Sequence, residues 1–307
     1  PSGYLGLAAC TEGAFVRYVD QIPASENRVL LLLERPYKRA RQAIIDLRRA
    51  KKTIIIAFAN PSLAHLSQHI SSLGDLELLQ EIASRAHAAI VPSPNLESTF
   101  RAFGMMFVAT IPPPVPVDEH QWDFSIRPEN RYGILLGTWD WKTPSKNHLL
   151  ALLSLREIVI QMYEPLTVWN LNGWNGRRWL RQLQYPAGTL QVIEKRLPYP
   201  EYLKMVARHK LVFHLDHSGG IGQIAADALL ARIPCIGGNG ALDQLLFPES
   251  SFGNHSISDL LQTTYLYMDH GHDRDTAVDH ALENARNNAS FQKTEEALES
   301  LFHGLGA

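Results

Sequence analysis

The order of short apolar runs along the chain constrains its fold most. Uniformly apolar runs alternate with stretches of helical period through most of the sequence. Strands that are apolar on both faces belong to parallel sheets covered by helices on both sides. We therefore expect strands at these runs, namely at 29–33, 53–58, 88–92, 132–136, 166–170, 190–193, 211–215 and 234–237. Helices are expected at 37–49, 76–86, 147–161, 177–184, 199–208 and 222–231, with a helical tail at 276–302.

A proline-rich segment interrupts this alternation. Residues 111–118 read Ile-Pro-Pro-Pro-Val-Pro-Val-Asp. Proline lacks a backbone donor and fixes φ, so this segment is predicted to be a stiff linker. We expect an α/β protein with two Rossmann-like domains facing an interdomain cleft, and ligands at the carboxyl ends of the strands. The predicted domains are 1–116 and 117–285, and a final helix at 286–307 is expected to pack back on the first domain.

The first predicted domain is short for a Rossmann-like domain. Two explanations stay open, because the sequence begins with Pro1 rather than Met. Either the sheet of this domain is reduced, or further residues precede Pro1 in a longer chain.

Composition and charge exclude several classes of protein. The formal net charge is -2 at pH 7, so no basic excess indicates a nucleic-acid partner. The longest apolar runs are far shorter than the roughly 20 residues of a membrane-spanning helix. No basic segment precedes an apolar signal region. Cys10 and Cys235 lie in apolar surroundings and are expected to be buried free thiols, so we expect a cytoplasmic protein.

A glycine-rich turn between a predicted strand and a predicted helix is the most informative motif. Gly219, Gly220 and Gly222 would let the backbone approach a ligand closely. The N-terminus of the helix that follows offers free N–H groups to a phosphate. Asp227 lies within the first two turns of that helix, where its carboxylate could accept hydrogen bonds from a ribose.

Two other interpretations of this motif remain open. The first is a tight structural turn followed by an incidental aspartate. The second is the dinucleotide fingerprint G-x-G-x-x-A, which Gly220, Gly222 and Ala225 match, with Asp243 about 20 residues further on. The second interpretation would make the protein a nicotinamide-dependent Rossmann enzyme.

The same stretch resembles the signature of retaining glycosyltransferases of family 4 (glycosyl transferases group 1), E-G-F-G-x4-E-A-x-A-x-G-x-P-V. Gly220, Ile221 and Gly222 stand at its G-F-G, and Asp227 stands at its second Glu. Gly219 replaces the first Glu. The resemblance implies a GT-B fold and metal-independent transfer of a sugar, with retention, from a nucleotide-sugar donor to an unidentified saccharide, lipid-linked or protein acceptor. It implies no metal and no cofactor.

The resemblance also implies roles for single residues. The family uses the second Glu to hold the nucleotide ribose, and this role falls to Asp227. The first Glu approaches the donor sugar, which Gly219 cannot do because it has no side chain. Donor contacts are implied for the whole turn, at Ser218, Gly219, Gly220, Ile221, Gly222 and Gln223.

Two further segments resemble donor-binding parts of the family. Gly137 to Asn147 resembles the phosphate clamp G-R-L-x-x-x-K-[GN], in which Arg and Lys hold the diphosphate. Lys146 fits the Lys, whereas Thr138 stands in place of the Arg, for which Lys142 could substitute. The segment from 197 to 203 resembles the loop and helix that hold the base, which implies contacts from Arg196, Leu197 and Tyr199. Lys146 and Asp227 are the predicted catalytic residues.

The first predicted domain carries less information. Family members often place a His after the middle strand, where this chain reads Ala57-Phe58-Ala59-Asn60, so Asn60 is expected on the acceptor side. The absent His, together with Gly219 and Thr138, favours an alternative function. The chain would then be a GT-B-like protein that has lost transfer activity and acts as a nucleotide-binding or scaffolding partner.

A basic helix is predicted near the N-terminus. Its cations are Arg35, Lys38, Arg39, Arg41, Arg48, Arg49, Lys51 and Lys52. Family members that act on lipid-linked acceptors often dock to anionic membranes through such helices, so the resemblance implies a peripheral membrane contact. An ordinary solvated helix face is the alternative.

Overall fold

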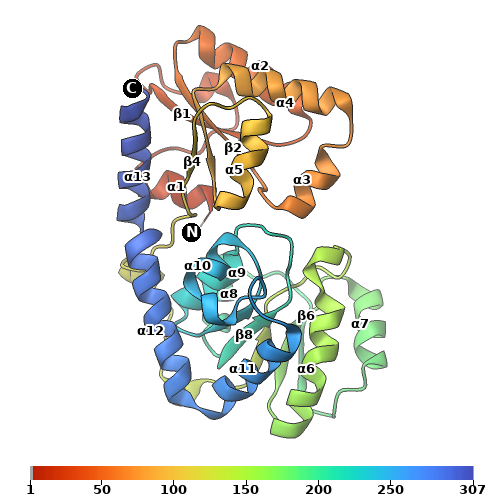
Figure 1. The fold of residues 1–307 in the computed structure, drawn as a ribbon. Coiled ribbons are helices and arrows are strands. Elements are labelled where there is room, and N and C mark those ends of the chain that lie inside the picture. Colours follow the sequence, from red (N-terminus) through yellow and green to blue (C-terminus); the bar gives the residue numbers. More distant parts are fainter. Residues whose placement is uncertain (1–2, 307) are drawn as a thin grey trace. The chain divides into compact units, whose positions relative to one another are not determined.

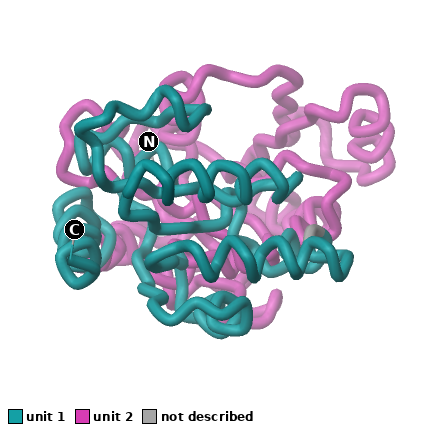
Figure 2. Tube along the Cα trace, turned by 90° about the horizontal axis from the view of Figure 1, so that it is seen from above, with its two compact units in different colours: residues 1–115, 288–307 teal, residues 116–287 magenta. Residues whose placement is uncertain are grey.

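The computed structural model describes residues 3–306, apart from the side chain of His69. The chain divides into two compact units, which Figure 2 shows in different colours. Unit 1 comprises residues 1–115 and 288–307, and unit 2 comprises residues 116–287. Unit 1 is therefore built from two segments that lie far apart in the sequence.

Unit 1 contains a parallel four-stranded sheet in the order β1-β2-β3-β4. Its strands are β1 (Arg28–Leu33), β2 (Thr53–Phe58), β3 (Ala88–Val91) and β4 (Val108–Thr110). Its helices are α1 (Tyr4–Cys10), α2 (Tyr37–Arg49), α3 (Leu63–His69), α4 (Leu73–Arg85), α5 (Glu97–Ala102) and α13 (Phe291–Gly304).

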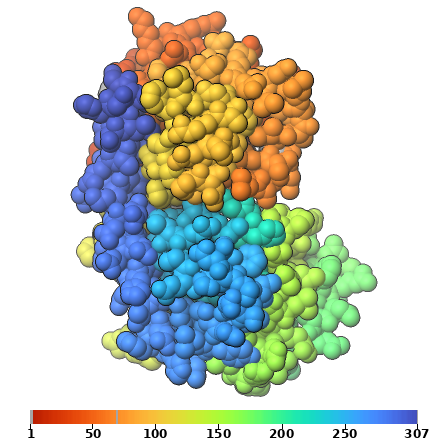
Figure 3. All heavy atoms as spheres, viewed as in Figure 1, coloured from red at the N-terminus to blue at the C-terminus, as the bar shows by residue number. Residues whose placement is uncertain are grey.

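Strand β2 shows why this sheet is covered on both faces. Ile54 and Ile56 are buried in a cluster with side chains of α2, α4 and α5. Ile55 and Ala57 point to the other face, where they are buried with side chains of α1 and α13, including Phe302. The two ends of the described chain thus build one face of unit 1 together (Figure 1). In the space-filling view, the dark blue atoms of α13 lie directly against other atoms of this unit (Figure 3).

Unit 2 contains a parallel five-stranded sheet in the order β7-β6-β5-β8-β9. Its strands are β5 (Ile134–Leu136), β6 (Leu166–Trp169), β7 (Leu190–Ile193), β8 (Leu211–His214) and β9 (Cys235–Gly237). Its helices are α6 (His148–Met162), α7 (Gly173–Gln182), α8 (Tyr199–Val206), α9 (Gln223–Leu230), α10 (Ala241–Leu246), α11 (Ile257–Asp269) and α12 (Gly271–Asn288).

The strand order of unit 2 reverses between β5 and β8. The chain builds outward from β5 through β6 to β7, and then returns to add β8 on the other side of β5. Loops that leave the carboxyl ends of two such strands diverge and open a crevice. The loops after β5 and β8 therefore flank the expected ligand position.

Short 3-10 helices connect several of these elements. They are η1 (Val19–Gln21), η2 (Pro94–Leu96), η3 (His120–Trp122), η4 (Pro128–Asn130), η5 (Pro144–Lys146) and η6 (Pro248–Ser250).

The predicted helical tail at 276–302 is confirmed, but it consists of two helices, α12 and α13, that are separated at residues 289–290. The hydroxyl of Ser290 accepts a hydrogen bond from the N–H of Lys293 and thereby caps the start of α13. Val115, at the end of the proline-rich segment, donates its N–H to the carbonyl of Ala289 at 2.7 Å. The chain is thus held in an extended conformation at the point where the two helices meet.

The cations near helix α2 are partly neutralised within unit 1. Arg41 pairs with Glu81 at 2.5 Å and Arg35 pairs with Asp75 at 2.9 Å. Lys52 is buried, and its ammonium donates to backbone carbonyls, among them that of Ala24 at 2.9 Å. The membrane contact remains a prediction. Within residues 3–306, no helix combines the length and the apolar character that a bilayer crossing needs.

Candidate functional site

The loops that follow β5 and β8 are joined by side chains. The ammonium of Lys146 donates to Oδ2 of Asp216 at 2.5 Å, and Asn147 donates its Nδ2 to the carbonyl of Leu215 at 2.9 Å. Burial alone would raise the pKa of Asp216, but the Lys146 ammonium holds that pKa below its ordinary value. The Lys146 side chain stays 34% exposed. The structure therefore brings the predicted phosphate lysine to the glycine-rich loop as half of an ion pair.

The glycine-rich loop presents unpaired backbone donors at the start of α9. Ser218 donates its N–H to Oδ1 of Asp216, and Gly219 donates its N–H to Oδ1 of Asn239 at 2.8 Å. Beyond Gly219, the N–H groups of residues 220–224 have no acceptor within the described part of the chain. A run of free N–H groups at a helix N-terminus is an anion-binding arrangement.

Glycine is required in this loop for steric reasons. Gly222 has φ of 79°, and a Cβ there would lie 2.7 Å from the backbone nitrogen of Asp243. Gly137, after β5, packs similarly tightly, because a Cβ there would lie 2.8 Å from Cγ2 of Ile224 on α9. Both glycines let the loops approach each other closely.

Asp227 is enclosed rather than open. The residue is only 4% exposed, and its Oδ1 accepts hydrogen bonds from the Tyr199 hydroxyl at 2.6 Å and from Nε2 of Gln223 at 2.7 Å. Burial raises the pKa of Asp227 to about 6, although hydrogen bonds from Tyr199, Gln223 and Tyr202 act in the opposite direction. A ribose could contact this carboxylate only after Tyr199 or Gln223 moves. The predicted residues 199, 223 and 227 nevertheless form one cluster.

Two aromatic side chains next to this cluster, Trp122 and Tyr202, were not predicted as site residues. The ring of Tyr199 lies 5.8 Å from that of Trp122 and 6.1 Å from that of Tyr202, measured between centroids. The guanidinium of Arg196 lies 5.4 Å from the ring centroid of Trp139, which follows β5. Tyr202 lies on α8 within the segment 197–203 that resembles the loop and helix that hold the base, whereas no sequence signal indicated Trp122.

Two of the predicted clamp residues differ in their surroundings. Thr138 is 2% exposed, and its hydroxyl bonds Nδ1 of His148 at 2.8 Å, so it faces the core instead of a ligand. Burial lowers the pKa of His148 to about 4 and keeps this imidazole neutral. Lys142 is exposed, in a turn where Asp140 accepts its backbone N–H at 2.9 Å. A cation is therefore available at 142 but not at 138.

The glycine-rich loop rests on a buried group of His214, Cys235 and Asp243. Their potential ligand atoms lie within 4.8 Å of one another, so this group is the candidate metal site among the described residues. Both carboxylate oxygens of Asp243 already have partners: Oδ1 faces Nε2 of His214 at 3.2 Å, and Oδ2 accepts the N–H of Gly240 at 2.8 Å. The group therefore braces the turn at Gly240, which packs against Gly222.

The remaining residues singled out from the sequence differ in their location and burial. Leu197 is half-buried in the loop between β7 and α8, and Ile221 is half-buried in the glycine-rich loop. Asn60 lies in unit 1, two residues beyond the end of β2, and is exposed. Its Oδ1 accepts the N–H of Ser62 at 3.4 Å. Cys10 and Cys235 are buried free thiols.

Comparison with known proteins supports the fold at low sequence identity. No family model and no curated protein sequence matches this chain. Sucrose-phosphate synthase from Thermosynechococcus elongatus is similar in structure, with a TM-score of 0.63 and 16% identity over 91% of this chain and 73% of that chain. The UDP-forming trehalose-phosphate synthase from Burkholderia xenovorans has a TM-score of 0.70 and 9% identity over 94% and 76%.

A third solved structure is described as "Trehalose-6-phosphate from E. coli bound with UDP-2-fluoro glucose". It has a TM-score of 0.70 and 10% identity, over 94% of this chain and 74% of that chain. These similarities confirm the α/β class with parallel sheets and show that the fold is that of the GT-B glycosyltransferases.

Proposed function

We propose that this chain is a GT-B glycosyltransferase that binds a nucleotide-sugar donor in unit 2 and transfers the sugar to an acceptor with retention. The observation that carries the proposal is the run of unpaired N–H groups at residues 220–224, in the loop whose Asp216 pairs with Lys146. This run lies next to the point where the strand order reverses, between β5 and β8. The similar fold of proteins whose descriptions name UDP or UDP-2-fluoro glucose supports a nucleotide-sugar ligand.

The donor diphosphate would lie against the start of α9. The N–H groups of the glycine-rich loop would donate to its oxygens, and the Lys146 ammonium would turn from Asp216 toward it. Negative charge grows on the diphosphate as the sugar leaves. Donors that are fixed in place before the reaction stabilise this charge without rearrangement, which lowers the barrier. Lys146 is the proposed catalytic residue on this side.

The nucleoside would lie between the loops after β5, β7 and β8. Arg196 and Trp139 already contact each other across two of these loops, and Tyr199 covers Asp227. We propose that the ribose displaces the Tyr199 hydroxyl or the Gln223 amide and takes its hydrogen bond to Asp227. Asn60 is the proposed acceptor-side residue in unit 1, and no metal or cofactor is part of the proposal.

Calorimetry with uridine, guanosine and thymidine diphosphates tests the donor site. We expect Lys146→Ala to weaken binding of the preferred diphosphate by about 1.5–3 kcal/mol, the range for a hydrogen bond to a charged group. Lys204→Ala is the matched control, because Lys204 is an exposed cation that pairs with Glu201 on α8. Equal affinity of the Lys146 and Lys204 variants would show that Lys146 does not contact the phosphates.

A nucleotide-binding or scaffolding protein without transfer activity is the second candidate. It is favoured by Gly219, which offers no side chain to a donor sugar, and by Thr138, whose hydroxyl is used inside the core. Mass spectrometry of products from a nucleotide-sugar panel separates the two functions. Binding without any turnover selects the scaffolding function, and the anomeric form of a product tests retention. Tighter binding of a reduced dinucleotide than of any diphosphate would instead select the nicotinamide-dependent alternative.

A further inference from the structure

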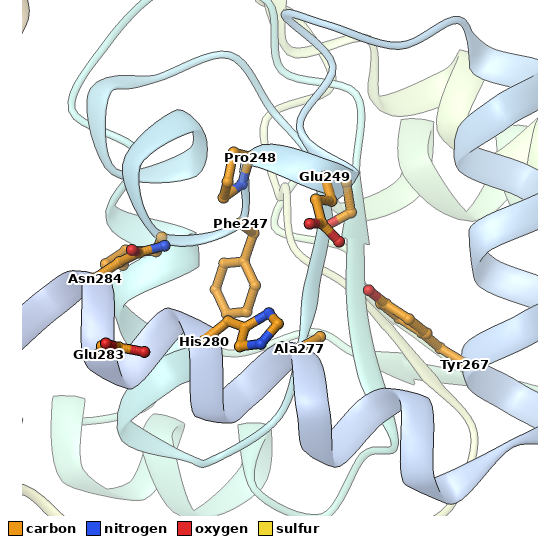
Figure 4. A pocket seen from close by; sticks show the side chains of 10 residues that line it. Phe247, Pro248, Glu249, Tyr267, Ala277, His280, Glu283 and Asn284 are labelled. Atoms are coloured by element: carbon orange, nitrogen blue, oxygen red, sulfur yellow. The ribbon is translucent and has the colours of Figure 1, made fainter.

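A pocket lies in unit 2 among residues that have no part in the proposed donor site. It is formed by the end of α10, by η6 and by helices α11 and α12 (Figure 4). Its volume is about 180 Å³, below the roughly 300–1,000 Å³ of pockets that hold drug-sized ligands. We call it the α12 pocket, and its size suits one small ring.

A buried phenol points into the α12 pocket. Tyr267 on α11 is 7% exposed, and Figure 4 shows its hydroxyl directed toward the space beside Glu249 and Phe247. No hydrogen-bond partner of this hydroxyl is found within residues 3–306. This hydroxyl lies at the pocket, so a ligand there could accept its O–H and could also donate to its oxygen.

Acceptors line the mouth of the α12 pocket. Glu249 comes from η6, and His280 and Glu283 come from one side of α12, three residues apart. All three are exposed, and none forms an ion pair or hydrogen bond with another described residue. The ring of Phe247 adds an apolar wall between these groups (Figure 4).

This combination selects the chemistry of the ligand. Two carboxylates repel a phosphate or another anion. An ammonium group would satisfy the carboxylates, but it has no lone pair to accept the Tyr267 O–H. A sugar hydroxyl can donate to a carboxylate and also accept from a phenol, and the C–H face of a sugar ring fits an aromatic wall. We propose that the α12 pocket binds one neutral sugar ring, independently of the donor site.

Ligand-observed NMR on the full chain, without nucleotide, tests this proposal with glucose, galactose, mannose and N-acetylglucosamine. We expect saturable binding of at least one of these sugars, and at least tenfold weaker binding by Glu283→Gln and by Tyr267→Phe. Glu283→Gln removes only an exposed charge, so it keeps the test valid even if the tyrosine variant fails to fold. Asp279→Asn, an exposed change on α12 outside the pocket lining, should leave the binding unchanged.

Three results would overturn the proposal. The first is that none of the four sugars binds saturably. The second is that Glu283→Gln binds the sugar as tightly as the unmodified chain does. The third is that putrescine, used as a probe for cationic ligands, binds at this pocket while the sugars do not. Lys146→Ala, which addresses the donor site, should leave sugar binding intact, so failure of the proposed donor site would not be mistaken for failure of this one.

Discussion

The buried carboxyl of Asp227 makes the stability of unit 2 depend on pH. Burial raises its pKa from the ordinary 3.8 to about 6 in the folded chain. The folded state therefore holds a proton that the unfolded chain has already lost, between about pH 4 and pH 6. The stabilisation is complete below the ordinary pKa and is lost as the pH rises through the raised one. One pKa unit corresponds to about 1.36 kcal/mol, so ionising this carboxyl costs the folded state roughly 3 kcal/mol.

Asp227→Asn removes this dependence, because an amide cannot ionise. We expect the free energy of unfolding of the variant, minus that of the unmodified chain, to rise by roughly 2.4 kcal/mol between about pH 4 and about pH 7.5. Little further change is expected above that range. The substitution can also change the free energy of unfolding by an amount that is the same at every pH. That constant change does not affect the rise, because only the pH dependence of the difference reports the ionisation of Asp227.

Urea titration followed by tryptophan fluorescence measures this difference in the correct part of the chain. All six tryptophans lie between residues 122 and 179, which belong to unit 2. Asp279→Asn is the control, since Asp279 is exposed on α12. If the stability of Asp227→Asn and that of the unmodified chain follow parallel curves across this pH range, Asp227 does not titrate as argued.

Three further predictions concern single residues. Asp227→Ala should weaken nucleoside diphosphate binding at least tenfold while Asp227→Glu retains it, which calorimetry checks; unchanged affinity of the Ala variant would remove Asp227 from the site. Gly222→Ala should also weaken diphosphate binding, because its Cβ would lie 2.7 Å from the Asp243 nitrogen; wild-type affinity would contradict the tight loop. Gly176→Ala should lower the stability of unit 2 by about 1–3 kcal/mol, since its Cβ would lie 1.9 Å from Oδ1 of Asn170; a urea midpoint at or above that of the unmodified chain would refute this.

The sequence predicted the elements that carry a strong local pattern. The predicted bounds of β2 and α2 agree with the structure because an apolar run and an amphipathic helix each mark their own ends. Strand β4 was missed because its three residues, Val108–Thr110, are too few to show a period. Helix α11 was also missed, since its buried positions include Thr264 and Tyr267 as well as aliphatic residues.

The candidate site was predictable only in part. The sequence placed Lys146 and the glycine-rich loop at strand ends, but not the pairing of Lys146 with Asp216, which depends on β5 and β8 being neighbours in the sheet. Strand order is a tertiary property that local patterns do not encode. The enclosure of Asp227 by Tyr199 depends likewise on how α8 packs beside α9, so its burial could not be read from spacing along one helix.

The discontinuous build of unit 1 has a consequence for how the protein is made on the ribosome. Residues 288–307 supply α13, whose side chains complete the core around Ile55 and Ala57. Domains generally begin to fold as they emerge, N-terminal residues first. Unit 2 can therefore close as soon as its last helix is synthesised, whereas the apolar sheet face of unit 1 stays uncovered until residues 288–307 have also been synthesised. Nascent chains stalled before α13 should accordingly be the most prone to aggregate and to recruit chaperones.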